Sequence, residues 1–447
     1  MAGFGAPTKV IFAASIMPCP FGGDLMRRAF LLPCAVLSGA VLATGPSVAA
    51  VPPPAHAAPR VVEYLGLRIP VPVGWEVHRL DREPSRCVRF DRHALYLGRP
   101  GPQQDCPPRL VGRTEALHVR PEERARPSAE GHRASGRVVR ADGLATLTVP
   151  PTVDHEARLT VPEAGAAITG VYGTDPAPLQ RILRGTRLDS RRATGTRSPA
   201  PPIPDQRPGR ARGDLPPDPA NPWVRGRGFD SCTAPSLATM RAWRPSFEVT
   251  NIYIGGAARG CAQPNLTEAW LSAVRDMGYR VTPTYVGLQA PCGSRRQRFT
   301  AKNAASQGAV AAEDAAAKAR ALGIPQGAPI YYDMEAYDSR NRGCKAAVLR
   351  FVDNWVRRLA SLGYDPCLYS SVKSGIRDVG DAEGISKPVA IWFAHWNGRA
   401  ELYGDPFVPD HWWHPHARIK QYRGGHKESH GGVTLNIDSN VVDGRVL

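Results

Sequence analysis

Acidic side chains recur at the ends of strand-like segments in the second half of the chain. Asp230 and Asp438 each end one such segment, and Asp333 and Glu335 end another, two residues apart. Side chains alternate along a strand, so Asp333 and Glu335 point to the same side. Carboxyl groups that crowd together separate their pKa values, which leaves one protonated and another ionised. Cleavage of a glycosidic bond requires that division, so we predict Asp230, Asp333, Glu335 and Asp438 as catalytic residues.

Aromatic and amide side chains occur in the same strand-like segments or shortly after them. Such groups suit the apolar faces and the hydroxyl groups of sugars. The predicted substrate-binding residues are Tyr253, Tyr285, Trp392, Trp396, Gln421 and Tyr422. A single strand-end acid often does no more than cap the following helix, so the prediction depends on the four acids taken together.

Eight apolar runs divide the second half of the chain, and amphipathic helices lie between several of them. The expected strands are Gly228–Asp230, Val249–Gly255, Val281–Val286, Ile330–Glu335, Cys367–Ser370, Val389–Ala394, Arg418–Tyr422 and Val433–Ile437. Helical spacing predicts helices over Thr267–Met277, Ala304–Leu322 and Cys344–Leu362. This alternation predicts an α/β fold, a (β/α)8 TIM-like barrel over residues 223–447. In such barrels the chemistry lies at the carboxyl ends of the strands, where this sequence has its acids.

The first half of the chain predicts a small β-rich domain over residues 60–190. Turn residues separate short alternating segments, and the expected strands are Leu67–Val73, Cys87–Phe90, Ala94–Gly98, Ala145–Val149 and Ala166–Val171. Residues 191–222 mix proline with arginine, aspartate and glycine, which predicts an extended linker. Two domains agree with the length of 447 residues, which exceeds one ordinary domain.

The amino end of the sequence predicts export. Met26-Arg27-Arg28 precedes an apolar run from Ala29 to Ala43, and small residues follow at 47–50. These are the parts of a secretory signal, so residues 1–50 are predicted to be a leader and the mature protein to be secreted or cell-wall associated. The Sec route and the twin-arginine route both fit. No later segment is apolar enough to span a bilayer, so stable membrane insertion is not expected.

Export permits disulfide bonds. Cys87 and Cys106 stand together in the first half of the chain and are predicted to pair. The second half has five cysteines, so one of them is left over: Cys232, Cys261, Cys292, Cys344 and Cys367. None has the C-x-x-C spacing of a structural zinc site.

The net charge of +17 does not predict a nucleic-acid face, because the excess is spread thinly except over the linker. Phosphate-binding loops, serine-hydrolase elbows and zinc-protease motifs are absent from the sequence. The histidines between His395 and His430 have no settled metal-ligand spacing. We therefore expect no nucleic acid, no cofactor and no metal, and the sequence leaves the oligomeric state open.

Five motifs of the second half resemble a known family. They are Gly228-Phe229-Asp230, Ile252-Tyr253-Ile254-Gly255-Gly256, Tyr331-Tyr332-Asp333-Met334-Glu335, Gln421-Tyr422 and Ile437-Asp438-Ser439-Asn440. They look like the secreted actinobacterial glycoside-hydrolase-like domain of unknown function, which is similar to family-25 lysozymes that cleave the peptidoglycan glycan. The resemblance spans residues 226–445. It implies the barrel fold, Glu335 as the proton donor, and peptidoglycan or another polysaccharide as the partner. The alternatives are a barrel that binds a glycan without cutting it and an exported scaffold.

The remaining cysteines fit such a barrel. Cys232 and Cys261 follow the first two strands, so they could pin adjacent loops together, and Cys292 and Cys344 follow the next two. Cys367 lies within the fifth strand and is expected to be a small buried residue.

Overall fold

The structure is a computed structural model, and it describes residues 59–122, 137–189 and 223–447. These residues belong to one compact unit, Ala57–Leu447. The predicted leader, residues 1–50, and the predicted linker, residues 191–222, lie outside the described residues. In the described part of the chain, no helix is long and apolar enough to cross a membrane.

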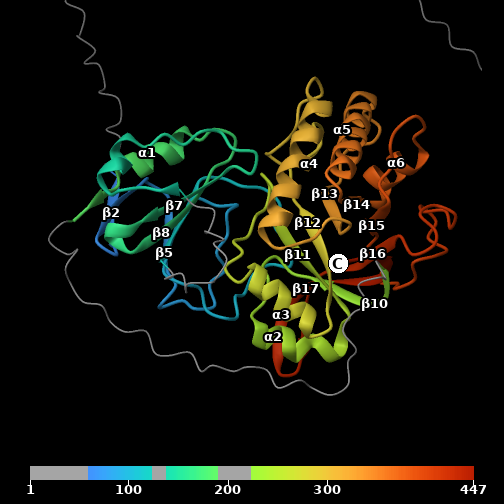
Figure 1. The fold of residues 1–447 in the computed structure, drawn as a ribbon, viewed down its shortest axis with the longest axis horizontal. Helices are drawn as coiled ribbons and strands as arrows, with labels where there is room; N and C mark the ends of the chain where they lie inside the picture. Colours follow the sequence, from blue (N-terminus) through green and yellow to red (C-terminus); the bar gives the residue numbers. More distant parts are fainter. Residues whose placement is uncertain (1–58, 123–136, 190–222) are drawn as a thin grey trace, which may run out of the picture. The chain divides into compact units, whose positions relative to one another are not determined.

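Eight strands close into a barrel in the order in which they follow along the chain (Figure 1). They are β10 (Trp223–Asp230), β11 (Val249–Gly255), β12 (Arg280–Tyr285), β13 (Pro329–Met334), β14 (Asp365–Ser371), β15 (Ala390–Ala394), β16 (Arg418–His430) and β17 (Val433–Arg445). Neighbouring strands from β10 to β16 are parallel. Every strand predicted for the second half overlaps one of these eight, so the α/β fold with a TIM-like barrel is confirmed.

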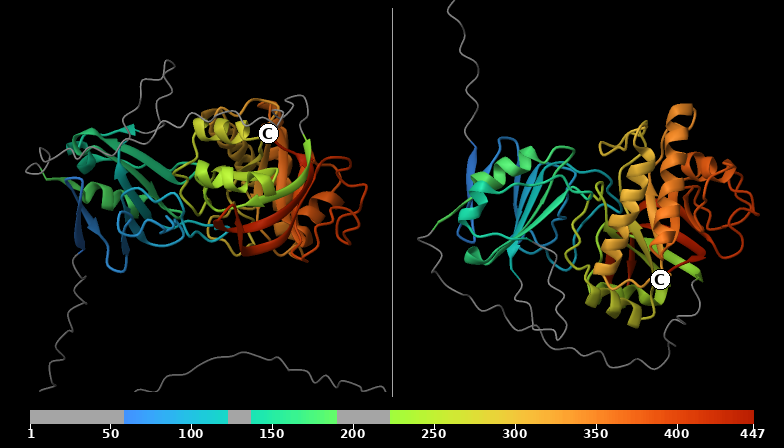
Figure 2. Two further views of the ribbon diagram at one scale, coloured as in Figure 1. Left: turned by 90° about the horizontal axis from the view of Figure 1, so that it is seen from below. Right: turned by 45° about the horizontal axis from the view of Figure 1, so that its top comes forward.

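Helices follow the first five strands of the barrel. They are α2 (Leu237–Trp243), α3 (Glu268–Asp276), α4 (Ala304–Ala321), α5 (Arg342–Ser361) and α6 (Arg377–Asp381). Thr267 caps α3, where its side chain accepts a hydrogen bond from the backbone N–H of Trp270. Helices α4 and α5 lie side by side (Figure 2). The buried face of α4 consists of alanines and Gly308, so the two helices approach closely.

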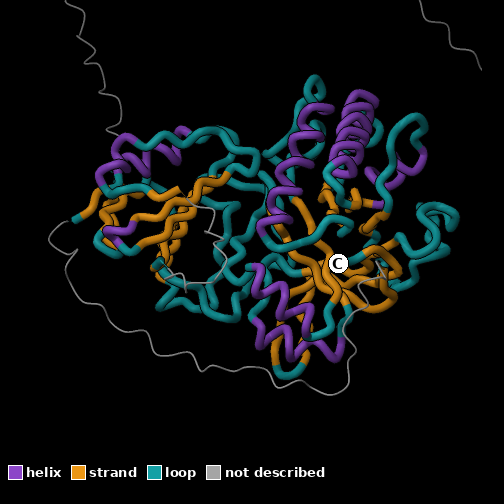
Figure 3. Tube along the Cα trace, viewed as in Figure 1, coloured by secondary structure: helices purple, strands orange, loops and turns teal. Residues whose placement is uncertain are grey.

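The last strand of the barrel differs from the predicted alternation of strand and helix. β17 is antiparallel to both of its neighbours, β16 and β10. Gly431 and Gly432, both with positive φ, form the two-residue turn between β16 and β17, and such a turn joins only antiparallel strands. The connection from β15 to β16 is also non-helical, a long loop (Figure 3). Asp438 therefore lies in the middle of its strand, yet it pairs in register with Asp230 at the end of β10.

Barrel strands are buried on both faces, and the two faces line different layers of the core. Tyr331, Tyr369 and Trp392 belong to a cluster inside the barrel. Tyr332 and Trp355 belong to the larger cluster between the barrel and its helices. Adjacent residues on one strand thus enter different layers, because side chains alternate.

Two further sheets and one helix form the small β-rich region. A three-stranded sheet has the order β1 (Arg60–Tyr64), β2 (Leu67–Val71) and β9 (Arg187–Leu188). A six-stranded sheet has the order β3 (Glu76–Arg79), β4 (Ala94–Leu97), β5 (Ala116–Pro121), β8 (Ala166–Val171), β7 (Glu156–Val161) and β6 (Arg137–Val138). Helix α1 (Ala177–Gly185) buries Leu179, Ile182 and Leu183 against this region.

Two predicted strands of this region are wrong. Ala145–Val149 overlaps a 3-10 helix, Asp142–Thr146, and continues without strand pairing. Cys87–Phe90 makes only an isolated bridge, between Arg89 and Cys261 of the barrel. Its backbone pairs with a distant loop rather than with a sheet neighbour, a partner that local alternation does not reveal.

The predicted cysteine pairs are confirmed. Disulfides join Cys87 to Cys106, Cys232 to Cys261, and Cys292 to Cys344. Cys367 is free and buried within β14.

Candidate functional site

The four predicted acids are buried at one rim of the barrel, three of them at the carboxyl ends of parallel strands and Asp438 within the antiparallel strand β17. Asp230 ends β10, Asp333 is the last residue but one of β13, and Glu335 directly follows that strand. Relative exposures are 0% for Asp230, 1% for Asp333, 1% for Asp438 and 9% for Glu335. Buried carboxyls need hydrogen-bonding partners, so the surrounding polar groups decide their chemistry.

Asp230 and Asp438 form the first pair of acids, and Gln421 of β16 connects them. Gln421 Nε2 donates to Asp230 Oδ2 at 3.0 Å and to Asp438 Oδ2 at 3.1 Å. Asn440 Nδ2 also donates to Asp230 Oδ2, at 2.7 Å. Asp230 thus receives more donors than Asp438, which favours a negative charge on Asp230.

The pKa values of this pair follow from burial and from these hydrogen bonds. Burial raises the pKa of Asp230 to about 6, against the opposing effect of the Asn440 and Gln421 hydrogen bonds. Burial, with the added charge of Asp230, raises the pKa of Asp438 to about 8. These pKa shifts favour a proton on Asp438 and a negative charge on Asp230.

Asp333 and Glu335 form the second pair, and Gln289 fixes the backbone between them. Gln289 Nε2 donates to the Asp333 carbonyl at 2.7 Å, and Glu335 N–H donates to Gln289 Oε1 at 2.7 Å. Burial, together with the charge of Glu335, raises the pKa of Asp333 well above its usual range. Oδ1 of Asp333 is buried and accepts no hydrogen bond from the described residues. This second pair is also suited to hold a proton.

Glu335 is engaged by two guanidinium groups. Arg295 Nη2, from the loop after β12, lies 2.7 Å from Glu335 Oε2. Arg109 Nη1, from the connection between β4 and β5, lies 3.5 Å from Glu335 Oε1. Arg109 Nη1 also donates to the Tyr369 hydroxyl. An arginine from the small β-rich region therefore reaches the acids of the barrel.

Four of the predicted substrate-binding residues lie at this cluster. The Tyr253 hydroxyl donates to Asp230 Oδ1 at 3.5 Å, and Trp392 Nε1 donates to Asn440 Oδ1 at 2.8 Å. Trp396 Nε1 donates to Gln421 Oε1 at 2.9 Å, and its side chain is 56% exposed. Trp396 is therefore the member of this set that an incoming ligand can contact.

Two predicted substrate-binding residues do not reach the acids. Tyr285 lies in the layer between barrel and helices, where its hydroxyl donates to Asp314 Oδ2 on α4 at 2.8 Å. Tyr422 lies at a register irregularity of β16 between Gln421 and Arg423, and among the described residues its side chain makes no hydrogen bond to the acids.

The sequence interpretation missed Tyr369, Gln289, Arg295 and Arg109. Tyr369 lies on β14 and its hydroxyl donates to Gln421 Oε1 at 3.0 Å. It lies two residues after Cys367, so strand alternation offered a signal for its face. Gln289, Arg295 and Arg109 lie in loops, where the sequence has no periodicity that would single them out.

Residues 241–442 match the family model described as "Rv2525c-like, glycoside hydrolase-like domain". The match lies within the barrel and includes Asp333, Glu335 and Asp438, whereas Asp230 precedes it. The chain therefore contains a glycoside hydrolase-like domain, and the resemblance predicted from the sequence is confirmed.

Three solved structures are similar to about half of the chain. An uncharacterized protein of B. stearothermophilus has 21% identity and a TM-score of 0.34, over 48% of this chain and 95% of that one. The catalytic domain of endolysin ply40 from bacteriophage P40 of Listeria monocytogenes has 13% identity and a TM-score of 0.30, over 49% and 93%. The spore cortex lytic enzyme SleM of Clostridium perfringens has 13% identity and a TM-score of 0.31, over 45% and 62%. No curated protein matches the chain at a significant level.

Proposed function

We propose that the protein is an exported glycoside hydrolase that acts on peptidoglycan or another cell-wall polysaccharide. The observation that carries this proposal is the set of two acid pairs at one rim of a glycoside hydrolase-like barrel, where Asp230 receives more hydrogen bonds than Asp438. Glycosidic cleavage needs one carboxyl group to protonate the leaving oxygen and another to act as nucleophile or base.

In the proposed mechanism, the pair nearest the surface supplies the proton. Burial favours a proton on Asp333, and Glu335, the more exposed of the two, is the group that faces the glycosidic oxygen and protonates it in this proposal. Asp230 is the ionised carboxyl that stabilises or attacks the sugar carbon. Asp438 is neutral in this mechanism, so Asp230 carries the negative charge of the pair. Trp396 is the proposed direct contact to the sugar, and Tyr253, Trp392 and Gln421 are proposed to line the site beneath it.

Export and division into domains belong to the same proposal. The predicted leader, residues 1–50, would direct export, and the disulfides fit an oxidising compartment. The proposed division is a small β-rich domain over 60–190, a linker over 191–222 and the catalytic barrel over 223–447.

The test uses the full-length protein with labelled peptidoglycan and labelled glycan fragments. We expect release of labelled fragments, and a loss of about a hundredfold or more in Glu335→Gln and Asp333→Asn. Asp381→Asn, at a half-exposed acid of α6, is the matched control and should keep the wild-type rate. Equal release by wild type and Glu335→Gln contradicts the proposal.

A second candidate is a barrel that binds a glycan without cutting it. The observation that favours it is that Glu335 forms ion pairs with Arg109 and Arg295. Calorimetry with glycan fragments separates the two candidates. Binding that persists in Asp333→Asn, without turnover by wild type or by Arg109→Ala, would support the binding protein.

A further inference from the structure

The small β-rich region contributes a segment, Cys106–Arg113, that runs beside a barrel loop after β11. Gly112 N–H donates to the Ala258 carbonyl at 2.7 Å, and Gly260 N–H donates to the Leu110 carbonyl at 3.1 Å. Val111 and Arg259 form an antiparallel bridge. Backbone hydrogen bonds of this kind fix the register of the segment, and so the position of Arg109, against the barrel.

Arg109 is the residue of this segment that enters the acid cluster. Its side chain is 14% exposed, and its guanidinium carbon lies 5.6 Å from the centre of the Tyr369 ring and 5.3 Å from that of Trp396. Distances of this size are typical of cation–π contacts. The Arg109 side chain therefore contacts Glu335, Tyr369 and Trp396 together.

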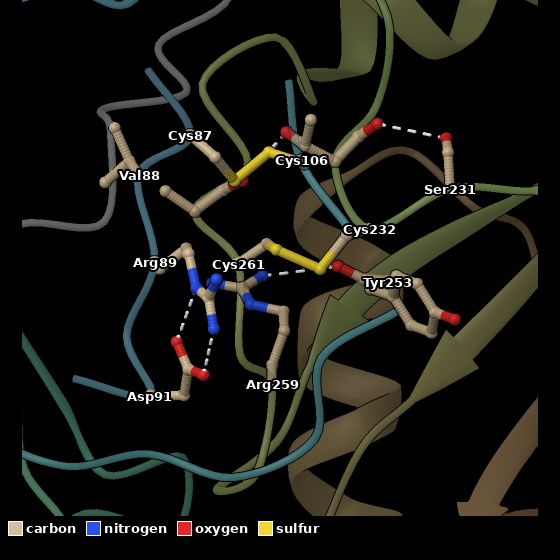
Figure 4. The surroundings of a disulfide bond; sticks show 12 residues. Cys87, Val88, Arg89, Asp91, Cys106, Ser231, Cys232, Tyr253, Arg259 and Cys261 are labelled. Atoms are coloured by element: carbon tan, nitrogen blue, oxygen red, sulfur yellow. Dashed lines mark hydrogen bonds and ion pairs between the residues drawn. A yellow bond between two sulfur atoms is a disulfide. The ribbon is translucent and has the colours of Figure 1, made fainter. Parts of the chain in front are cut away.

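Two anchors hold the segment at its ends. At one end, the disulfide of Cys106 lies next to the Cys232–Cys261 disulfide of the barrel, with Leu110 against them (Figure 4). At the other end, Glu156 Oε2 lies 3.0 Å from Arg113 Nη2 and 3.1 Å from Arg259 Nη2. All three members of this ion cluster are buried.

Arg109 lies where a substrate would have to approach Glu335. A glycan that reacts at Glu335 must displace Arg109, because the guanidinium lies 3.5 Å from Glu335 Oε1 and over the rings of Tyr369 and Trp396. We propose that the Cys106–Arg113 segment is autoinhibitory, and that the wild-type barrel works below its full rate until Arg109 withdraws from Glu335. This inference builds on the proposed hydrolase function, but the occlusion itself can be measured without any turnover.

The experiment measures carboxyl accessibility in the full-length protein. A water-soluble carbodiimide and an amine label exposed carboxyl groups, and peptide mapping reads the rate at Glu335. The variants are Arg109→Ala and Arg109→Lys, and Arg68→Ala is the control, because Arg68 is a half-exposed arginine on β2. Near-ultraviolet circular dichroism checks that each variant keeps the wild-type packing, and Arg109→Lys retains the charge if the alanine variant does not fold.

We expect labelling of Glu335 to be about tenfold faster or more in Arg109→Ala, because protection reflects the population of the opened form. The labelling rate of Glu335 in Arg109→Lys should lie between those of wild type and Arg109→Ala, and the rate in Arg68→Ala should equal that of wild type. Equal labelling of wild type and both Arg109 variants would overturn the inference. Glycan release separates this inference from the proposed function. Faster labelling of Arg109→Ala without any glycan release supports the occlusion and refutes hydrolysis. Glycan release by wild type, with unchanged labelling in the Arg109 variants, supports hydrolysis and refutes the occlusion.

Discussion

Arg109 of the small β-rich region and Glu335 of the barrel form an ion pair, with Nη1 and Oε1 3.5 Å apart. The two residues are more than two hundred positions apart in the chain. Glu335 lies beside Asp333, so the arginine is also part of the electrostatic environment of that acid and opposes the rise of its pKa. The small region is therefore a part of the site's electrostatics.

Replacement of Asp438 by asparagine should change how stability depends on pH. The folded-state pKa of Asp438 is raised to about 8, whereas an aspartate in an unfolded chain titrates near pH ~4. Between these values the folded protein binds more protons than the unfolded chain, so the free energy of unfolding falls as pH rises. Asp438→Asn removes this loss, and the variant should exceed wild type by about 1 kcal/mol or more at pH 8.

Urea denaturation at pH 5 and at pH 8 measures the difference. Asp381→Asn on α6 serves as the control, because its side chain is 52% exposed, and its stability should follow wild type at both pH values. An unchanged pH dependence in Asp438→Asn would show that Asp438 does not take up a proton on folding.

Replacement of Glu156 by glutamine should strongly destabilise the protein. Glu156 has a 3% exposed side chain and faces Arg113, Arg158 and Arg259. A neutral amide leaves buried guanidinium groups without a counter-charge, which costs about 3 kcal/mol or more. Glu163→Gln, in a partly exposed pair with Arg140, should cost less than about 1 kcal/mol. Thermal and urea unfolding compare the two, and similar losses would contradict this account.

The sequence was informative where a pattern repeats along one element. The apolar runs located all eight barrel strands, and the spacing around Phe351 and Trp355 located α5. The acids at strand ends came together because strand ends share one rim of a barrel. These features depend on residues close in sequence, which is why they could be predicted.

Other features depend on information that one strand does not contain. Tyr331 and Tyr332 are both fully buried, one inside the barrel and one under the helices, so alternation of apolar and polar residues is lost. That loss explains why the sequence does not show that Tyr285 lies under the helices. Gly431-Gly432 is a hairpin signal that defines the direction of β17, yet the repeating alternation of the other strands dominated the interpretation. Arg109 has no local signal, because its partner belongs to another part of the chain.

Replacement of Gly308 by alanine should destabilise α4, although alanine is the better helix former. A Cβ atom at Gly308 would lie 2.3 Å from the Phe351 carbonyl oxygen of α5, so the helices would have to move apart. Gly343→Ala is the matched control within α5, because its nearest neighbour would be an Asn341 side-chain oxygen at 3.5 Å. We expect Gly343→Ala to be neutral or to stabilise by about 0.5–1 kcal/mol, and Gly308→Ala to lower the melting temperature. The same gain in both variants would contradict close packing of α4 on α5.

Replacement of Gln421 by leucine should raise the pKa of Asp230. Burial places this pKa at about 6, and the hydrogen bonds from Asn440 and Gln421 prevent a larger rise. Hydrogen bonds to a charged group contribute about 1.5–3 kcal/mol, so loss of the Gln421 donor should move the midpoint upward by about one unit. Carbon-detected NMR titration of aspartate-labelled protein measures this midpoint without requiring turnover. Gln326→Leu, at a surface glutamine that donates to the Leu362 carbonyl, is the control and should leave the Asp230 midpoint unchanged. An Asp230 midpoint equal to that of wild type in Gln421→Leu would show that this amide does not set the charge of the first acid pair.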